Sequence, residues 1–254
     1  MEEAIIPMQI VVLAAGHGKR MNNSELPKVL VPLKGKPIIK YLLEAIKKSE
    51  VTNKPVIVVG QKADIVKQTL GPEYNYVFQA KQLGTGQAVA CARDLLKDKA
   101  ANVMVLYGDH PLITPQTIKR LAESHLKSEA TITMATVRVD DFNGWRKPLY
   151  DFGRIIRDQI GKVVKIVEKK DAAQDELKIT EVNPGYYCFQ ADWLWNNLPK
   201  LKNDNVQQEY YLTDLTALAV HQGQAINSLE IDAPEALGVN SPEQLKILEN
   251  LICS

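Results

Sequence analysis

Residues 9–21 read QIVVLAAGHGKRM, which joins an almost wholly apolar run to a turn rich in glycine and basic residues. The run from Gln9 to Ala15 is typical of a strand covered on both faces in a parallel sheet. The glycines at 16 and 18 allow backbone N–H groups to approach phosphates, while Lys19, Arg20 and Lys28 add cationic donors. We therefore predict a triphosphate-binding turn at the end of the first strand.

The glycines alone fit a plain tight turn equally well. Position 21 is Met where a dinucleotide-binding fingerprint needs a third glycine, and the Walker ending GK[ST] is missing. The phosphate interpretation therefore depends on the rest of the chain.

Similar apolar runs recur downstream, at PVIVV (55–59) and NVMVLY (102–107), with helical patterns between and after them. The helical patterns cover residues 38–46, 88–96 and 118–126. This alternation predicts an α/β fold with a doubly wound, mostly parallel sheet that places ligands at the carboxyl ends of its strands.

After about residue 131 the pattern becomes rich in strands, with TITMATVRV, GRIIRD, KVVKIVEKKD and EVNPGYYCF, and helices are predicted again at 192–197 and 210–222. We predict one domain over 1–254, with a nucleotide-binding half (about 8–130) and a smaller strand-rich substrate half (about 131–254). The stretch DDFNGWRKPLYD (140–151) carries Asn-Gly and Lys-Pro turn signals and is predicted to be an exposed loop.

The bulk composition limits the classes of partner. The formal net charge is +1, from 31 basic and 30 acidic residues, so no general field favours nucleic acid or an anionic membrane. Cys91, Cys188 and Cys253 are far apart and show no zinc or disulfide spacing. With neither a signal peptide nor a membrane-length apolar stretch, we expect a cytoplasmic protein.

The run LAAGHGKRM (13–21), followed by Pro27 and Lys28, resembles the signature G-x-G-x-R-M with a later P-K pair found in nucleotide-sugar pyrophosphorylases. The segment VFQAKQLGTGQAVACA (77–92) is similar to the uracil-reading segment of bacterial N-acetylglucosamine-1-phosphate uridyltransferases. YGDHPL, GRI, IVEKKDA, EYYLTD and GVN follow in that family's order. The resemblance implies a Rossmann-like nucleotide-diphospho-sugar transferase fold. In the family this domain is usually the N-terminal half of a bifunctional enzyme, and we expect no hexapeptide-repeat acetyltransferase half within this sequence.

The resemblance also implies a nucleotide site. It makes Arg20 and Lys28 the catalytic cations, and it assigns these residues to UTP: Leu13, Ala14, Ala15, Gly16, Gly18, Lys28, Gln79, Gln82, Gly84 and Thr85. A Gln side chain offers both a donor and an acceptor to a pyrimidine edge. Without the adjoining LGTG, Gln79 and Gln82 would more simply be solvated residues at a strand end.

A Mg²⁺ site is implied at Asp109 of YGDHPL and Asn240 of GVNSPEQL. Carboxylate and amide oxygens suit this hard cation, with phosphate oxygens and water completing its octahedron. An isolated Asp after a strand more often caps a turn, and Ser241 with Pro242 also resembles a helix start.

On the sugar side the resemblance implies seven residues: Tyr107, Gly108, Gly153, Glu168, Asn183, Tyr211 and Thr213. Glu168 beside two lysines also fits a plain surface acid, and the tyrosine pair at 210 and 211 also fits ordinary packing. The chain departs from the family pattern at His17 in the glycine loop, at Pro184 where N-T-G is usual, and in the longer 140–151 stretch.

The sequence therefore predicts a Mg²⁺-dependent enzyme that joins UTP to N-acetylglucosamine-1-phosphate and releases pyrophosphate. A sugar phosphate is already an anionic nucleophile, so the reaction needs alignment and charge neutralisation more than a side-chain base. The same chemistry with glucose-1-phosphate or dTTP, and a non-catalytic nucleotide-sugar-binding regulator, stay open as alternatives. The oligomeric state is not readable from the sequence.

Overall fold

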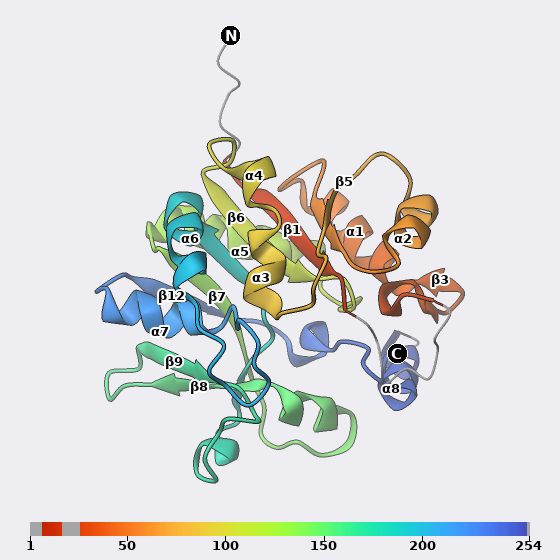
Figure 1. Cartoon of the computed structure of the whole chain (residues 1–254). Helices are drawn as coiled ribbons and strands as arrows, with labels where there is room; N and C mark the ends of the chain where they lie inside the picture. Colours follow the sequence, from red (N-terminus) through yellow and green to blue (C-terminus); the bar gives the residue numbers. More distant parts are fainter. Residues whose placement is uncertain (1–6, 17–25, 253–254) are drawn as a thin grey trace.

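The computed structural model describes residues 7–16 and 26–252, and its main feature is a large central sheet with helices on both faces (Figure 1). The strands are β1 Gln9–Ala14, β2 Pro32–Leu33, β3 Lys36–Pro37, β4 Val56–Val59, β5 Asn75–Phe78, β6 Asn102–Tyr107, β7 Ile132–Arg138, β8 Gly153–Arg157, β9 Val163–Val167, β10 Glu181–Asn183, β11 Tyr187–Gln190 and β12 Ile226–Glu230. The helices are α1 Ile38–Ser49, α2 Ala63–Leu70, α3 Thr85–Ala90, α4 Arg93–Leu96, α5 Pro115–Ser128, α6 Ala191–Asn197, α7 Asp214–His221 and α8 Pro242–Ile252.

The strand order of the main sheet is β5-β4-β1-β6-β11-β7-β10-β8-β9, with β12 also paired to β7. β5, β4, β1 and β6 are parallel neighbours, so the predicted doubly wound, mostly parallel architecture is confirmed. The chain leaves β1 toward β4 on one side and reaches β6 on the other. This reversal places a ligand crevice at the carboxyl ends of β1 and β6.

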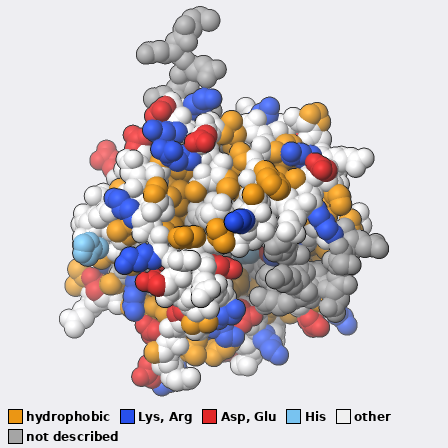
Figure 2. Space-filling view, in the orientation of Figure 1, with side chains coloured by type: hydrophobic (Ala, Val, Ile, Leu, Met, Phe, Trp, Pro, Cys, Tyr) orange, Lys and Arg blue, Asp and Glu red, His pale blue; other side chains and the backbone are white. Residues whose placement is uncertain are grey.

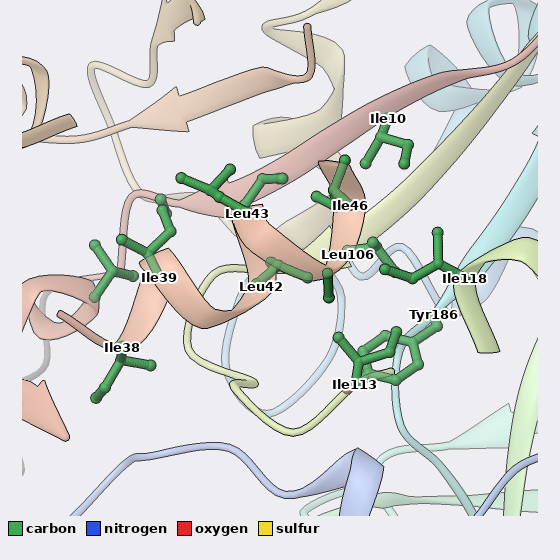
Figure 3. Packing of buried hydrophobic residues seen from close by; sticks show 14 of the residues in the cluster. Ile10, Ile38, Ile39, Leu42, Leu43, Ile46, Leu106, Ile113, Ile118 and Tyr186 are labelled. Atoms are coloured by element: carbon green, nitrogen blue, oxygen red, sulfur yellow. The ribbon is translucent and has the colours of Figure 1, made fainter. Parts of the chain in front are cut away.

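The apolar strands read as continuous runs because both faces of the sheet are covered. Ile10 and Val12 of β1 pack with α1 and α5, while Val11 and Leu13 pack with α3 and α6 on the other face. Figure 3 shows Ile38, Ile39, Leu42, Leu43 and Ile46 of α1 packed near Ile10, Leu106 and Ile118. Each fully buried aliphatic side chain contributes about 1.5–3 kcal/mol, so these layers hold the crevice-bearing strands rigidly.

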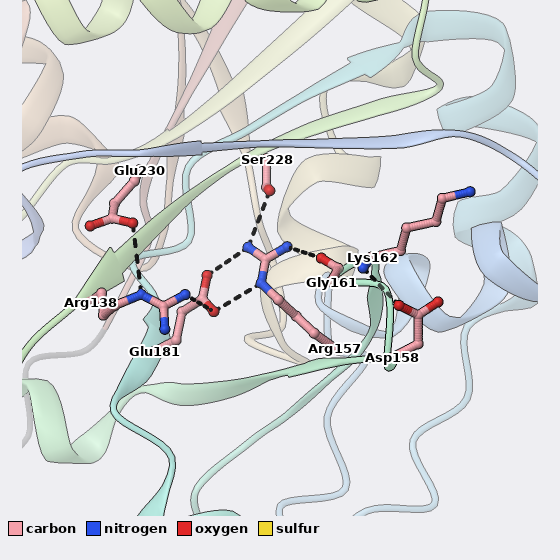
Figure 4. A network of polar contacts seen from close by, with 8 residues as sticks. All are labelled: Arg138, Arg157, Asp158, Gly161, Lys162, Glu181, Ser228 and Glu230. Atoms are coloured by element: carbon pink, nitrogen blue, oxygen red, sulfur yellow. Dashed lines mark hydrogen bonds and ion pairs between the residues drawn. The ribbon is translucent and has the colours of Figure 1, made fainter.

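The second half of the chain continues the same sheet. β11 inserts between β6 and β7 and is antiparallel to both. Beyond it, β10 and the β8–β9 hairpin extend the sheet, and β9 packs beside α7 (Figure 1). Glu181 of β10, only 5% exposed, accepts hydrogen bonds from Arg138 at 2.9 Å and from Arg157 at 2.6 Å (Figure 4). This clamp joins β7, β8 and β10 through one carboxylate.

Three local predictions need correction. The helix predicted at 210–222 begins at Asp214, because backbone hydrogen bonds commit Tyr210 to the segment around Leu83 instead. The stretch 140–151 is not an exposed loop: residues 144–151 form a 3-10 helix, with Leu149 buried and Trp145 packed on the core. The pattern at 88–96 belongs to the separate helices α3 and α4.

The surface agrees with the charge balance. Figure 2 shows Lys and Arg side chains interspersed with Asp and Glu on the face in view, without a large field of one sign. Among the described residues, no helix has the length and apolar character needed to cross a membrane.

Candidate active site

A cavity of about 540 Å³ opens at the carboxyl ends of β1 and β6. It brings together most of the predicted nucleotide-binding residues with the predicted metal ligands. Its lining consists of Leu13, Ala14, Ala15, Gly16, Lys28, Val29, Gln79, Gln82, Gly84, Thr85, Ala88, Tyr107, Asp109, Glu209 and Asn240. Gly18 and Arg20, also predicted here, lie outside the described residues.

The amide of Gln79 at the floor of this cavity has one end already in use. Gln79 is 3% exposed, and its Nε2 donates to Gln87 Oε1 at 2.6 Å and to Gly84 O at 3.3 Å. Its Oε1 is therefore the end left for a ligand, and it is an acceptor only. The sequence predicted a side chain offering both functions, whereas the structure commits the donor internally. No sequence motif pointed to Gln87 as the partner of Gln79.

The segment Leu83–Gly86 is joined by hydrogen bonds to the segment Tyr210–Leu212. Tyr210 N donates to Leu83 O at 2.8 Å, Gly86 N donates to Tyr210 O at 2.8 Å, and Leu212 N donates to Thr85 Oγ1 at 3.0 Å. Gly84 has φ +110°, and a Cβ there would lie 2.6 Å from Tyr210 O. Only glycine fits so close an approach in this backbone region. Segments 127 residues apart thus form one wall of the site.

Lys28 occupies the point between the predicted metal ligands. Its Nζ lies 2.6 Å from Asp109 Oδ2 and 2.9 Å from Asn240 Oδ1. The oxygens of Asp109 and Asn240 are therefore close enough to share one cation. Within the described residues, no group of at least three His, Cys, Asp or Glu side chains forms a metal cage. A hard divalent ion fits this pair only with phosphate and water oxygens as its remaining ligands.

Asp109 is kept ionised although it is 5% exposed. Burial acts to raise its pKa, but the positive charge and hydrogen bond of Lys28, with a contribution from His110, outweigh burial, and the pKa of Asp109 is lowered. The loop that carries Asn240 is tied to the same place, because Val239 N donates to Asp109 O at 3.1 Å. The Asp109 carboxylate is therefore charged, and the loop that carries Asn240 is held beside it.

A second cavity of about 310 Å³ adjoins the first and shares Thr85, Tyr107, Glu209 and Asn240 with it. It contains six of the seven predicted sugar-side residues: Tyr107, Gly153, Glu168, Asn183, Tyr211 and Thr213. Sequence reasoning missed the other lining residues, which are Pro148, Asp151, Phe152, Gly185, Gln207 and Gln244, and it gave His110 and Pro184 no binding role. Predicted Gly108 lines neither cavity; it is packed beside Leu13 O, Val29 and Ile39.

Glu168 is the polar centre of the second cavity. Burial raises its pKa, although Thr213 Oγ1 donates a hydrogen bond to Glu168 Oε1 at 3.1 Å and acts in the opposite direction. Asn183 Oδ1 accepts from Gly185 N at 3.0 Å. This carboxylate and amide suit the hydroxyl and amide groups of a sugar.

The rim of the second cavity is held by a buried cation. Arg154 is 0% exposed, donates to Phe152 O and, at 3.0 Å, to Tyr150 O, and lies 5.0 Å from the ring centres of Phe142 and Tyr150. These contacts flank Asp151 and Phe152, which line the cavity. The 3-10 helix that the sequence did not predict is thus the element that shapes this rim.

The comparisons with known proteins agree on one family. The MobA-like NTP transferase domain matches residues 10–191. The chain is 43% identical over 243 residues to the bifunctional protein GlmU of Clostridium beijerinckii, covering 95% of this chain and 51% of that protein. It is 41% identical over 231 residues to the bifunctional protein GlmU of Enterococcus faecalis, covering 91% of this chain and 48% of that protein. The chain thus spans about half the length of these curated relatives.

Among solved structures, the fold is similar to that of a UDP-glucose pyrophosphorylase complexed with UDP-glucose. The TM-score is 0.76 and the sequence identity 18%, with 98% of this chain and 99% of that chain covered. This likeness establishes the shared fold.

Proposed function

The chain belongs to the MobA-like NTP transferase domain family, and from this membership we propose that it joins UTP and N-acetylglucosamine-1-phosphate to give UDP-N-acetylglucosamine and pyrophosphate. The observation that carries the proposal is the junction of the two cavities. Thr85, Tyr107 and Asn240 line both cavities. Lys28 and Asp109 line the first cavity, together with Gln79 and Gln82. Two ligands bound side by side would therefore meet at a cation-binding pair of oxygens.

In the proposed reaction, a phosphate oxygen of the sugar-1-phosphate attacks the α-phosphorus of UTP. A new P–O bond forms, the bond between the α-phosphorus and its bridging oxygen breaks, and pyrophosphate leaves with that oxygen. The nucleophile is already anionic, so no described side chain has to remove a proton. Lys28 would neutralise phosphate charge, and Arg20, which lies outside the described residues, is proposed to act with it.

We propose Mg²⁺ as the cation, held by Asp109 and Asn240. When bound, it would supply positive charge to the phosphate oxygens of both substrates. The donor set supports this choice, because Asp109 and Asn240 offer only oxygen and already share one ammonium.

UTP is proposed because the acceptor Oε1 of Gln79 suits the N3–H donor of uracil. N-acetylglucosamine-1-phosphate is proposed from the resemblance of the LGTG and EYYLTD segments. We also propose the single-domain organisation of 1–254, which is supported by the sheet running through both halves, and a cytoplasmic location.

The test is pyrophosphate release by the purified protein with Mg²⁺, each nucleoside triphosphate and a panel of sugar-1-phosphates. We expect fast release only with UTP and N-acetylglucosamine-1-phosphate, and collapse of release with EDTA or in Asp109→Ala. The matched control is Asp175→Ala, which removes an exposed carboxylate that pairs with Lys178 outside both cavities. Release with glucose-1-phosphate or dTTP instead would revise the substrates, and binding of UDP-sugars without any release would favour a regulator.

A further inference from the structure

Gln244, in the first turn of α8, lines the sugar-side cavity beside Asn240 and was assigned no role by the sequence. Its side-chain oxygen is already used, because Asn240 N donates to Gln244 Oε1 at 2.6 Å. An amide that accepts through its oxygen has its two N–H donors on the other arm of the group. No hydrogen bond within residues 7–16 and 26–252 uses Gln244 Nε2.

Helix capping explains only half of this arrangement. Ser241 and Gln244 have the S-x-x-Q spacing of a capping box, and Gln244 N donates to Ser241 Oγ at 3.3 Å. In a capping box the Gln side chain reaches back to the backbone N–H of the cap residue, whereas here it reaches one residue further, to Asn240. Capping accounts for the oxygen of Gln244 and leaves the nitrogen free to serve a ligand.

The same contact fixes Asn240. Val239 N is held by Asp109 O at 3.1 Å, and Asn240 N is held by Gln244 at 2.6 Å. Asn240 therefore keeps Oδ1 toward Lys28 while Gln244 occupies the sugar side of the same loop.

We propose that Gln244 is a substrate-binding residue that donates from Nε2 to a phosphate oxygen of the sugar-1-phosphate, while its oxygen holds Asn240 in place. The inference rests on the proposed function of the site. A phosphate oxygen is chosen because Gln244 lines the sugar-side cavity only, next to Asn240, which lines both. An N–H donor at that junction suits the anionic end of the sugar phosphate.

The decisive variant is Gln244→Glu. Glutamate keeps an oxygen for Asn240 N and is equally suited to a capping box, so a purely structural glutamine would tolerate the change. On the present proposal, the change replaces a donor by a negative charge facing phosphate. We expect the KM for N-acetylglucosamine-1-phosphate to rise about tenfold or more, with the KM for UTP within about twofold and the Tm unchanged.

Gln244→Met and Lys246→Gln complete the series. Met removes the donors without adding charge, so its effect on the sugar-phosphate KM should be smaller than that of Glu. Lys246→Gln lowers the net charge by the same amount at an exposed position of α8 and should leave both KM values unchanged. An unchanged sugar-phosphate KM in Gln244→Glu, or a smaller rise than in Gln244→Met, overturns the proposal.

A binding measurement separates this inference from the proposed function. Calorimetry with N-acetylglucosamine-1-phosphate, in the presence of Mg²⁺ and an unreactive UTP analogue, does not require turnover. We expect Gln244→Glu to lose about tenfold in affinity for the sugar phosphate and little for free N-acetylglucosamine. Failure of the wild-type protein to release pyrophosphate would defeat the proposed function, whereas equal affinity of the two proteins, or no binding by either, would defeat the role of Gln244.

Discussion

The ammonium nitrogen of Lys28 lies 2.6 Å from Oδ2 of Asp109, so the carboxylate proposed to hold Mg²⁺ already has a cation beside it. Asn240 Oδ1 contacts the same nitrogen at 2.9 Å. A metal ion held by this pair of oxygens, as proposed, would therefore compete with Lys28 for them. With the metal in place, Lys28 would be left to contact the phosphates.

The first prediction follows from this competition. In Lys28→Met the oxygens of Asp109 and Asn240 lose their ammonium, so the free protein should bind Mn²⁺, used as a reporter for Mg²⁺, about tenfold more tightly. Pyrophosphate release should nevertheless fall about 100-fold, because a cation is lost from the phosphates. Electron paramagnetic resonance of Mn²⁺ and the release assay measure the two effects.

Lys36→Met provides the control for that experiment, since Lys36 pairs with Glu44 away from both cavities. Weaker Mn²⁺ binding in Lys28→Met would contradict the idea that lysine and metal share the oxygens.

The second prediction concerns the base. Gln79→Leu removes the acceptor proposed for uracil N3–H and should lower kcat/KM for UTP about 10- to 100-fold. Gln87→Leu should act more subtly: it frees Gln79 Nε2 to face the base, so the preference for UTP over CTP should fall. Gln87→Glu keeps an acceptor for Gln79 Nε2 and serves as the control. If the wild type and Gln87→Leu prefer UTP over CTP to the same degree, the hydrogen bond between Gln79 and Gln87 does not determine the orientation of the Gln79 amide.

The third prediction concerns Arg154. Arg154→Met leaves the carbonyls of Tyr150 and Phe152 without their donor and releases the rim at Asp151. We expect the KM for the sugar-1-phosphate to rise about tenfold with little change for UTP, and the free energy of unfolding to fall by about 2–4 kcal/mol. Arg154→Lys should restore part of the sugar-phosphate KM. Arg146→Met, which removes the partly exposed partner of Asp141, is the matched control.

The fourth prediction is a pH dependence of stability. His125 is 2% exposed and bonded to Thr133 and Asn102, and burial lowers its pKa from 6.5 to about 4. Between these values the unfolded chain binds a proton at His125 that the folded chain does not, so the contribution of His125 to the free energy of unfolding falls as the pH drops from about 6.5 to 4. His125→Gln should flatten this slope in urea unfolding at pH 7, 6 and 5. His221 is exposed, so His221→Gln should leave the pH slope unchanged.

The parts of the fold that were predictable are those coded locally. β1, β4 and β6 were recognisable because strands buried on both faces must be apolar throughout. β5 reads NYVF and lies at the sheet edge with partly exposed side chains, and β12 reads INSLE, so neither shows the same pattern. β12 in addition pairs with β7, a strand distant in the sequence, which no local pattern reports.

In the candidate site, too, some features could be predicted from the sequence and others could not. Asp109 and Asn240 were assigned from motifs, and the structure brings both to Lys28. The direction in which the Gln79 amide faces depends on Gln87, and the rim near Asp151 depends on Arg154, so neither could be predicted from spacing alone. Ser241 and Pro242 were recognised as a helix start, but Gln244 was not singled out.

The hydrogen bonds between Leu83–Gly86 and Tyr210–Leu212 limit how such an enzyme can be re-engineered. A Cβ on Gly86 would lie 3.0 Å from Tyr210 O, and one on Gly84 would lie 2.6 Å from the same oxygen. The segment proposed to read the base and the segment proposed to close on the sugar are therefore one structural unit. A chimera that imports a new nucleotide loop while keeping the old sugar loop would inherit mismatched halves, so altered substrate pairs should be sought by transplanting both segments together.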